Sequence, residues 1–123
     1  MAKTDVLIYQ DADGRVPLLD WLDGLPVKAR DKCIVRVELL AQMGHDLRRP
    51  HCDLLEQGVF ELRARLGSVN YRILYAFVGH HVVLLSHGCT KERAVPKTEI
   101  NQALRNLEQF RKDPKAHTCT EGL

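Results

Sequence analysis

The sequence of 123 residues lacks the patterns that define several large classes of protein. Its apolar runs are no longer than a β-strand, so no segment is expected to span a bilayer. The first ten residues, MAKTDVLIYQ, lack the basic start, the long apolar stretch and the small-residue cleavage site of a signal peptide. No GxGxxG, GxxxxGK(S/T), GxSxG or HExxH motif occurs, which leaves the nucleotide-fold, P-loop, hydrolase and zinc-protease interpretations without support. We therefore expect a cytoplasmic protein without a cofactor.

Cysteine and histidine are present, but not at the spacings that metal sites use. His51 with Cys52 and His87 with Cys89 are the closest pairs. Neither pair has structural-zinc spacing, and adjacent strand residues point to opposite faces, so we expect no metal site. We expect reduced thiols, as is usual in the cytoplasm, with Cys33 a small core residue on the apolar side of a helix. The four cysteines are Cys33, Cys52, Cys89 and Cys119.

The net charge of +2 hides an uneven distribution. Residues 58–112 carry nine Lys or Arg and four Asp or Glu, whereas the rest of the chain carries nine basic and twelve acidic residues. A basic half on a nearly neutral protein favours an anionic partner, nucleic acid first. A solvated basic surface without a partner fits the charge equally well.

Three strand-like runs follow one another along 59–97, the stretch around which the chain is organised. Residues 59–66 alternate between apolar and charged side chains, which is the period of a half-buried strand. Residues 69–78 are rich in aromatic and β-branched side chains, and 81–86 form a nearly unbroken apolar run. Gly67-Ser68 and Gly79-His80 supply the turns between them. The pattern predicts a three-stranded meander whose third strand is buried on both faces.

The segments on either side supply further elements for one α+β domain. Strand 5–10 precedes two amphipathic helices, 16–22 and 26–43, which we expect to form a helical hairpin over one face of the sheet. Residues 45–58 are expected to be an irregular loop, and a last helix begins at Pro96 or Thr98. The prediction is a single domain over 1–112, in which an N-terminal strand, the hairpin and a C-terminal helix pack on a mainly antiparallel twisted sheet. Residues 113–123 are expected to be a loose tail.

Cationic side chains on and beside the meander are the candidate functional residues. An arginine inside a strand costs desolvation energy unless its head meets solvent or an anion. Arg63 and Arg65 share a face with Glu61, so an ion pair with Glu61 explains them as well as RNA contact does. Arg72 lies among apolar residues, where a cation on a rigid sheet can stabilise a phosphate. Further candidates are Lys91, Arg93 and Lys97 after the third strand and Arg48 and Arg49, which either reach a phosphate backbone or belong to a plain loop.

The motifs FELR, YRILYAF, VVLLSHGCTKER and PKTEI, in that order, resemble the RelE/ParE superfamily of bacterial toxins. The closest likeness is to its HigB-like, phage-derived branch. The resemblance runs from the opening DVLIYQDADG through LLDWL and LPVKAR to the last helix. It implies a helical hairpin packed on a mainly antiparallel twisted sheet, which agrees with the prediction from periodicity.

The resemblance also implies a function and partners. Such toxins belong to type II toxin–antitoxin systems, in which a neighbouring antitoxin, here expected to be a HigA-like helix-turn-helix protein, binds and silences the toxin. The complex would bind operator DNA. RelE-like and HigB-like members cut mRNA in the ribosomal A site without a metal, by attack of the RNA 2′-hydroxyl on the adjacent phosphate. The expected partners are therefore antitoxin, mRNA and ribosome, and no membrane.

The resemblance assigns roles to individual residues. Arg72 matches the arginine that stabilises the transition state, and Lys91 and Arg93 match the basic residues after the last core strand. Lys97 lies near the position of a family tyrosine that has no clear equivalent here. The lysines that RelE carries on its first meander strand are replaced by Val59 and Glu61, so Glu61 or His87 is left as the candidate general base. Both also fit a structural role. The expected RNA-binding residues are Arg63, Arg65, Lys97, Arg48 and Arg49.

Two other functions within the superfamily compete with RNA cleavage. A ParE-like protein would poison DNA gyrase by binding, with no catalysis of its own. A degenerate member would bind only its antitoxin or operator DNA. The basic residues after the third strand favour the nuclease, because ParE-like proteins generally lack that full set.

Overall fold

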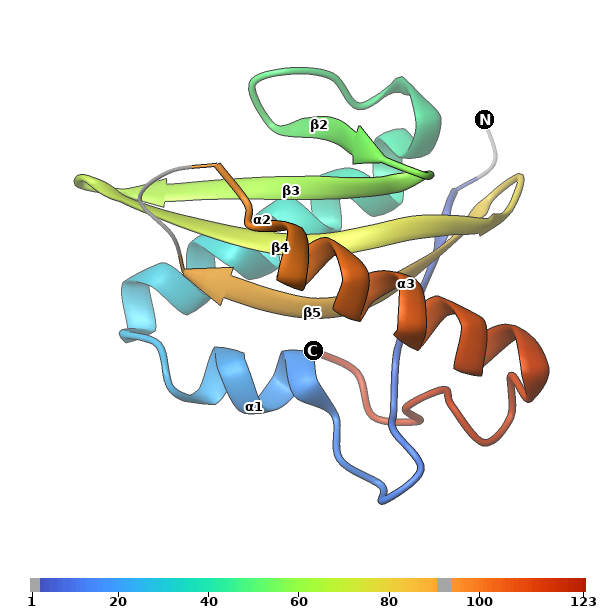
Figure 1. Ribbon diagram of the computed structural model, residues 1–123. Helices are drawn as coiled ribbons and strands as arrows, with labels where there is room; N and C mark the ends of the chain where they lie inside the picture. The colour runs from blue at the N-terminus through green and yellow to red at the C-terminus, as the bar shows by residue number, and fades with distance from the viewer. Residues whose placement is uncertain (1–2, 91–93) are drawn as a thin grey trace.

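The computed structural model describes residues 3–90 and 94–123, and the described part of the chain is an α+β fold, as expected (Figure 1). A mixed five-stranded sheet carries helices on both faces. In chain order the elements are β1 (Asp5–Ile8), α1 (Pro17–Asp23), α2 (Val27–Met43), the 3-10 helix η1 (Gly44–Asp46), β2 (Cys52–Glu56), β3 (Val59–Leu66), β4 (Val69–Gly79), β5 (Val82–Thr90) and α3 (Lys97–Lys112).

The strands are arranged in the order β1-β5-β4-β3-β2. The β3-β4-β5 meander is antiparallel, which confirms the central prediction, and β2 adds to β3 in the same sense. β1 pairs with β5 in parallel, so β5 lies between two strands. Residues 83–87 of β5 are all buried, as the apolar run predicted. The strand extends to Thr90, beyond the predicted end at residue 86.

Side chains of each strand point alternately to the two faces of the sheet, and helices cover both faces. α1 and α2 cover one face, where Leu18 and Leu40 join a core that includes Leu62, Ile73 and Leu85. α3 covers the other face and buries Ile100 and Ala103 against Leu74 (Figure 1). The predicted helical hairpin over one face of the sheet is confirmed, and below we call the two sides the α2 face and the α3 face.

Cys33 belongs to the α2-face core, as expected, and Trp21 packs against this core. Cys33 is 1% exposed, and burial raises the pKa of its thiol to about 11. Trp21 packs over Gly88 of β5, where an added Cβ would lie 2.1 Å from the indole ring. The indole N–H donates to the Thr90 hydroxyl at 3.2 Å. Only glycine at position 88 allows α1 to approach β5 this closely.

The expectation of an irregular loop over 45–58 was wrong. This segment contains η1 and the edge strand β2, which pairs with β3 from Cys52 opposite Leu62 to Glu56 opposite Val59. A register shift between Leu54 and Glu56 breaks the period of two that identifies a strand in sequence.

The expectation of a loose tail over 113–123 was also wrong. The amide of Cys119 donates to the carbonyl of Ile8 at 2.8 Å, and the amide of Gln10 donates to the carbonyl of His117 at 3.0 Å. The His117 ring stacks on Tyr9 with a centroid distance of 5.6 Å. The tail therefore lies antiparallel to the outer edge of β1, which it covers.

No helix within the described residues is long and apolar enough to cross a membrane. Within the same residues, no three His, Cys, Asp or Glu side chains are grouped so as to hold a metal ion.

Candidate functional site

The register of the meander places the candidate residues in two rows on the α3 face. Glu61, Leu74 and His87 are paired across β3, β4 and β5 and form one row. Arg63 and Arg72 are directly opposite each other in the next row. Two like charges placed opposite each other in a sheet repel, so a neutralising group is required between them.

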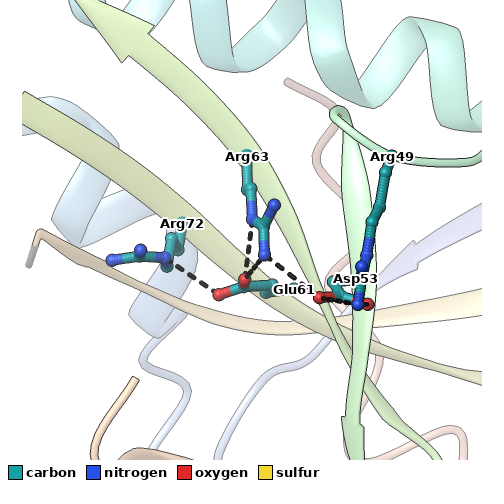
Figure 2. A network of polar contacts seen from close by, with 5 residues as sticks. All are labelled: Arg49, Asp53, Glu61, Arg63 and Arg72. Atoms are coloured by element: carbon teal, nitrogen blue, oxygen red, sulfur yellow. Dashed lines mark hydrogen bonds and ion pairs between the residues drawn. The ribbon is translucent and has the colours of Figure 1, made fainter. Parts of the chain in front are cut away.

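Glu61 is that neutralising group. Its side chain is 4% exposed, and its Oε1 accepts from the Nε of Arg63 at 2.7 Å. Its Oε2 lies 2.9 Å from the Nε of Arg72 (Figure 2). One buried carboxylate therefore holds two guanidinium groups that come from adjacent strands.

The ion-pair network continues to the edge of the sheet. Arg63 Nη2 lies 3.2 Å from Asp53 Oδ2 in β2, and Arg49 Nη2 lies 3.0 Å from the same oxygen (Figure 2). The hydrogen bond from Arg49, assisted by the charges of both arginines, lowers the pKa of Asp53. The network thus joins the central strand β4 to the loop before β2.

Arg72 is the most buried cation of the network, with a side chain 10% exposed. Its terminal guanidinium nitrogens point away from the Glu61 carboxylate (Figure 2). Arg72 is paired with Cys89 of β5, and Cys89 is one residue before Thr90, at which β5 ends. Arg72 therefore lies beside the end of this strand. Lys91 and Arg93 follow directly in the sequence and lie outside the described residues.

The backbone that carries Arg63 and Arg65 is braced from α2. β2 ends its pairing at Leu62, which leaves the outer side of the rest of β3 without a partner strand among the described residues. Arg36 donates to the Arg63 carbonyl at 3.1 Å, and Lys32 donates to the Arg65 carbonyl at 3.0 Å. These bonds satisfy edge carbonyls and fix the strand beneath the arginines.

His87 belongs to a separate network that ties β5 to α3. The Asn106 amide donates to the Ser86 hydroxyl at 2.9 Å, and this hydroxyl lies 2.8 Å from His87 Nδ1. With Nδ1 accepting from Ser86, a neutral ring donates Nε2–H to Glu99 across 3.2 Å. Burial lowers the pKa of His87 and outweighs the opposing effect of Glu99, which favours this neutral form.

The two candidate bases, Glu61 and His87, are therefore not neighbours. Leu74, which is fully buried, lies between them in the same row. Two strand spacings place their backbones about 10 Å apart.

The remaining predicted RNA-binding residues lie outside the Glu61 network. Arg65 is exposed and donates to the Gly67 carbonyl at 3.0 Å. Arg48 donates to the Leu47 carbonyl at 3.2 Å and also to that of His45. Lys97 contacts Glu56 and is 58% exposed. Of the predicted cations, the structure brings together Arg49, Arg63 and Arg72. Arg48, Arg65 and Lys97 lie outside this network.

Sequence reasoning missed four polar residues of the two networks. Glu99 lies within the quoted PKTEI motif, and Asp53 follows a residue pair considered for metal binding, but neither pattern indicated a partner. Ser86 and Asn106 are joined only by the packing of α3 on β5, which the sequence does not display. The missed residues are Asp53, Ser86, Glu99 and Asn106.

The geometry of the described residues is that of a buried acid that holds two cations on a rigid sheet. A family described as "Phage derived protein Gp49-like (DUF891)" matches residues 20–108, a span that reaches from α1 to α3 and includes both networks. No curated protein matches the sequence significantly. The family confirms the expected superfamily, and such toxins act together with an antitoxin. The chain belongs to the Gp49-like phage-derived protein family, which is a RelE/ParE-like toxin family of toxin–antitoxin systems.

Proposed function

We propose that this chain is a HigB-like toxin that inhibits translation by cutting mRNA in the ribosomal A site, and that its antitoxin is a HigA-like helix-turn-helix protein. The observation that carries the proposal is the Arg72 guanidinium, held through Nε by the buried Glu61 carboxylate. A cation preorganised on a central strand stabilises charge that develops on a phosphate without having to reorganise during the reaction.

In the proposed reaction, the RNA 2′-hydroxyl attacks the adjacent phosphorus and loses its proton to a base. The bond from phosphorus to the 5′-oxygen breaks, this oxygen takes up a proton, and a 2′,3′-cyclic phosphate remains. Negative charge accumulates on the non-bridging phosphate oxygens during the attack, and Arg72 is the residue assigned to it. The proposed reaction needs no metal.

We assign Glu61 a positioning role in this mechanism. Its carboxylate is buried, and both of its oxygens already contact guanidinium groups. A proton acceptor needs an oxygen within reach of the 2′-hydroxyl, whereas Glu61 faces Arg63 and Arg72. The role that fits these contacts is to fix the direction of the two arginines.

His87 also fits a structural role better than a catalytic one. Both ring nitrogens are engaged, by Ser86 and by Glu99. We therefore assign the proton transfers to Lys91, which follows the strand end beside Arg72: its neutral amine would accept the 2′-hydroxyl proton and give a proton to the 5′-oxygen. Arg93, which stays protonated, would bind phosphate. The exposed cations Arg49, Arg65 and Lys97 are assigned to RNA phosphates, which they would hold without reading sequence.

The test is induced expression of the protein, followed by primer extension on one message in translated and untranslated forms. We expect growth arrest and cuts within codons of the translated form only. Arg72→Ala should abolish both, while Arg111→Ala, an exposed cation at the end of α3, should leave them unchanged. Growth arrest with DNA damage and intact mRNA would identify a gyrase poison instead. Retained cleavage by folded Arg72→Ala would remove Arg72 from the mechanism.

A further inference from the structure

One outer edge of the sheet is covered by another segment of the chain, and the other edge is not covered by a described residue of another strand. The edge of β1 is covered by the C-terminal tail through Tyr9 and Thr118. At the opposite edge, β2 has no further strand beside it in the described part of the chain (Figure 1). An uncovered edge presents backbone donors and acceptors to a passing peptide.

The register shows which groups β2 presents. The amide of Arg63 donates to the carbonyl of His51 at 2.8 Å, and Asp53 is paired with Glu61 two residues further on. Backbone groups alternate in direction along an antiparallel strand. The His51 carbonyl and the Asp53 backbone groups therefore face β3, while the His51 N–H donates to the Arg48 carbonyl at 3.1 Å. Cys52 and Leu54 direct their N–H and C=O groups outward.

A cleft of about 450 Å³ adjoins this edge on the α2 face. Its aromatic wall consists of Phe60, Tyr75 and Phe77, with the His45 ring stacked on Phe77 at a centroid distance of 3.6 Å. Leu54 also lines the cleft and is 55% exposed. An exposed leucine beside an aromatic cleft is typical of a binding site in which an apolar side chain of a partner fills the cleft.

The charge around the cleft is positive. Arg48 and Arg49 both line it, and Arg49 is 76% exposed. Asp53 is the acidic residue of the lining, and it is already paired with Arg49 and Arg63. Carboxylates on an incoming segment would therefore find complementary charge.

We propose that the antitoxin docks here, adding an extended segment to the outer edge of β2, with one apolar side chain in the cleft and flanking carboxylates near Arg48 and Arg49. The proposal rests on the proposed function only in taking the partner to be the antitoxin. Strand addition obtains affinity from main-chain hydrogen bonds and specificity from a side-chain pocket. An RNA strand has no amide ladder to match the backbone of Cys52 and Leu54, so the edge favours a peptide.

The first measurement uses the unaltered protein and the full-length antitoxin encoded beside its gene. Hydrogen exchange should slow at the amide of Cys52 when the antitoxin binds, because this amide would become hydrogen-bonded. It should slow less at the amide of Leu54, which already bonds to the Asp53 carboxylate. Unchanged exchange at both amides in a saturated complex would overturn the proposal, since no strand would then have been added to β2.

The second measurement uses variants and the dissociation constant of the same complex. Leu54→Pro removes an outward N–H, together with its bond to the Asp53 carboxylate, and leaves the Asp53 ladder bonds in place. We expect binding about tenfold weaker than for Leu54→Ala, which retains the N–H. Arg49→Glu should weaken binding at low salt and approach the unaltered protein at high salt. Arg111→Glu, with the same charge change on α3, should bind normally.

These results separate the docking site from the nuclease. A Leu54→Pro protein that cuts mRNA normally but escapes neutralisation by the antitoxin would support the proposal. A Leu54→Pro protein that binds antitoxin as Leu54→Ala does but loses cleavage would mark the cleft as an RNA site and overturn it. If the unaltered protein cuts no RNA, the proposed function fails, whereas the exchange and affinity measurements still decide the docking surface.

Discussion

Replacing Glu61 by glutamine tests whether one carboxylate organises the site. The amide keeps the shape of the side chain but removes the charge that Arg63 and Arg72 share. The two guanidinium groups, directly opposite each other across β3 and β4, would then face a neutral group. We expect Glu61→Gln to destabilise the protein and to reduce the proposed RNA cleavage, because Arg72 loses the contact that directs it.

The size of the effect follows from the burial of the partners. Arg72 and Glu61 have side chains 10% and 4% exposed, and removing one partner of a buried pair costs about 3–5 kcal/mol. The Arg63 side chain is 34% exposed, so loss of its ion pair with Glu61 adds only about 0.5 kcal/mol to the destabilisation. Since Arg72 retains some contact with solvent, we take the lower end, about 3 kcal/mol. For a chain of 123 residues this lowers Tm by roughly 12 °C.

The assay is urea and thermal unfolding of Glu61→Gln, Arg72→Met and the double variant. The double variant leaves no unpaired charge between positions 61 and 72, and Arg63 keeps Asp53 as a partner. It should therefore be less destabilised than the sum of the single variants by about 2 kcal/mol. Arg65→Met, an exposed site on the same strand, serves as the control and should change stability by less than about 0.5 kcal/mol.

Two results would refute this reasoning. One is a stability of Glu61→Gln within about 0.5 kcal/mol of the unaltered protein, and the other is additivity of the two single variants within that margin. A stable Glu61→Gln that lost all cleavage would also count against a positioning role, since a proton acceptor would give that outcome.

Two further predictions concern α1 and α3. Gly88→Ala places a methyl group 2.1 Å from the Trp21 ring, so it should destabilise the protein by about 1–3 kcal/mol and shift the tryptophan fluorescence; unchanged fluorescence and stability would contradict the close contact. Burial lowers the pKa of His87, so the unfolded chain protonates first, and stability should be lost as the pH falls below about 6.5 toward the lowered pKa. His87→Gln should reduce this dependence of the free energy of unfolding on pH, measured from unfolding curves at several pH values. An unchanged dependence on pH would contradict the role of His87.

The sequence predicted the meander because its signals are local. Residues 59–66 alternate cleanly, Gly67 and Gly79 mark the turns, and the predicted bounds of β3 and β4 agree with the structure to within one residue. The amphipathic pattern of α2 likewise indicated that this helix buries one face against the sheet. Arg72 was also singled out correctly as a cation within an apolar strand.

What the sequence could not predict depends on contacts between distant segments. The tail is ordered because His117 stacks on Tyr9, more than one hundred residues earlier in the chain. β2 is a strand because β3 supplies its partners, and its own register shift hides it. The link from Glu61 to Arg72 crosses between strands, so the spacing of residues in β3 alone indicated only Arg63 and Arg65 as partners.

The parallel pairing of β1 with β5 has a consequence for the nascent chain. Asp5 is paired with Val82, so β1 remains without its neighbour until most of the sequence has been synthesised. The β3-β4-β5 hairpins close short loops and can form first, whereas closing the long loop between β1 and β5 costs more chain entropy. We expect β1, and the tail that lies along it, to be the last parts of the sheet to assemble. A translating ribosome would therefore carry the arginine-bearing hairpin in folded form before the sheet is complete.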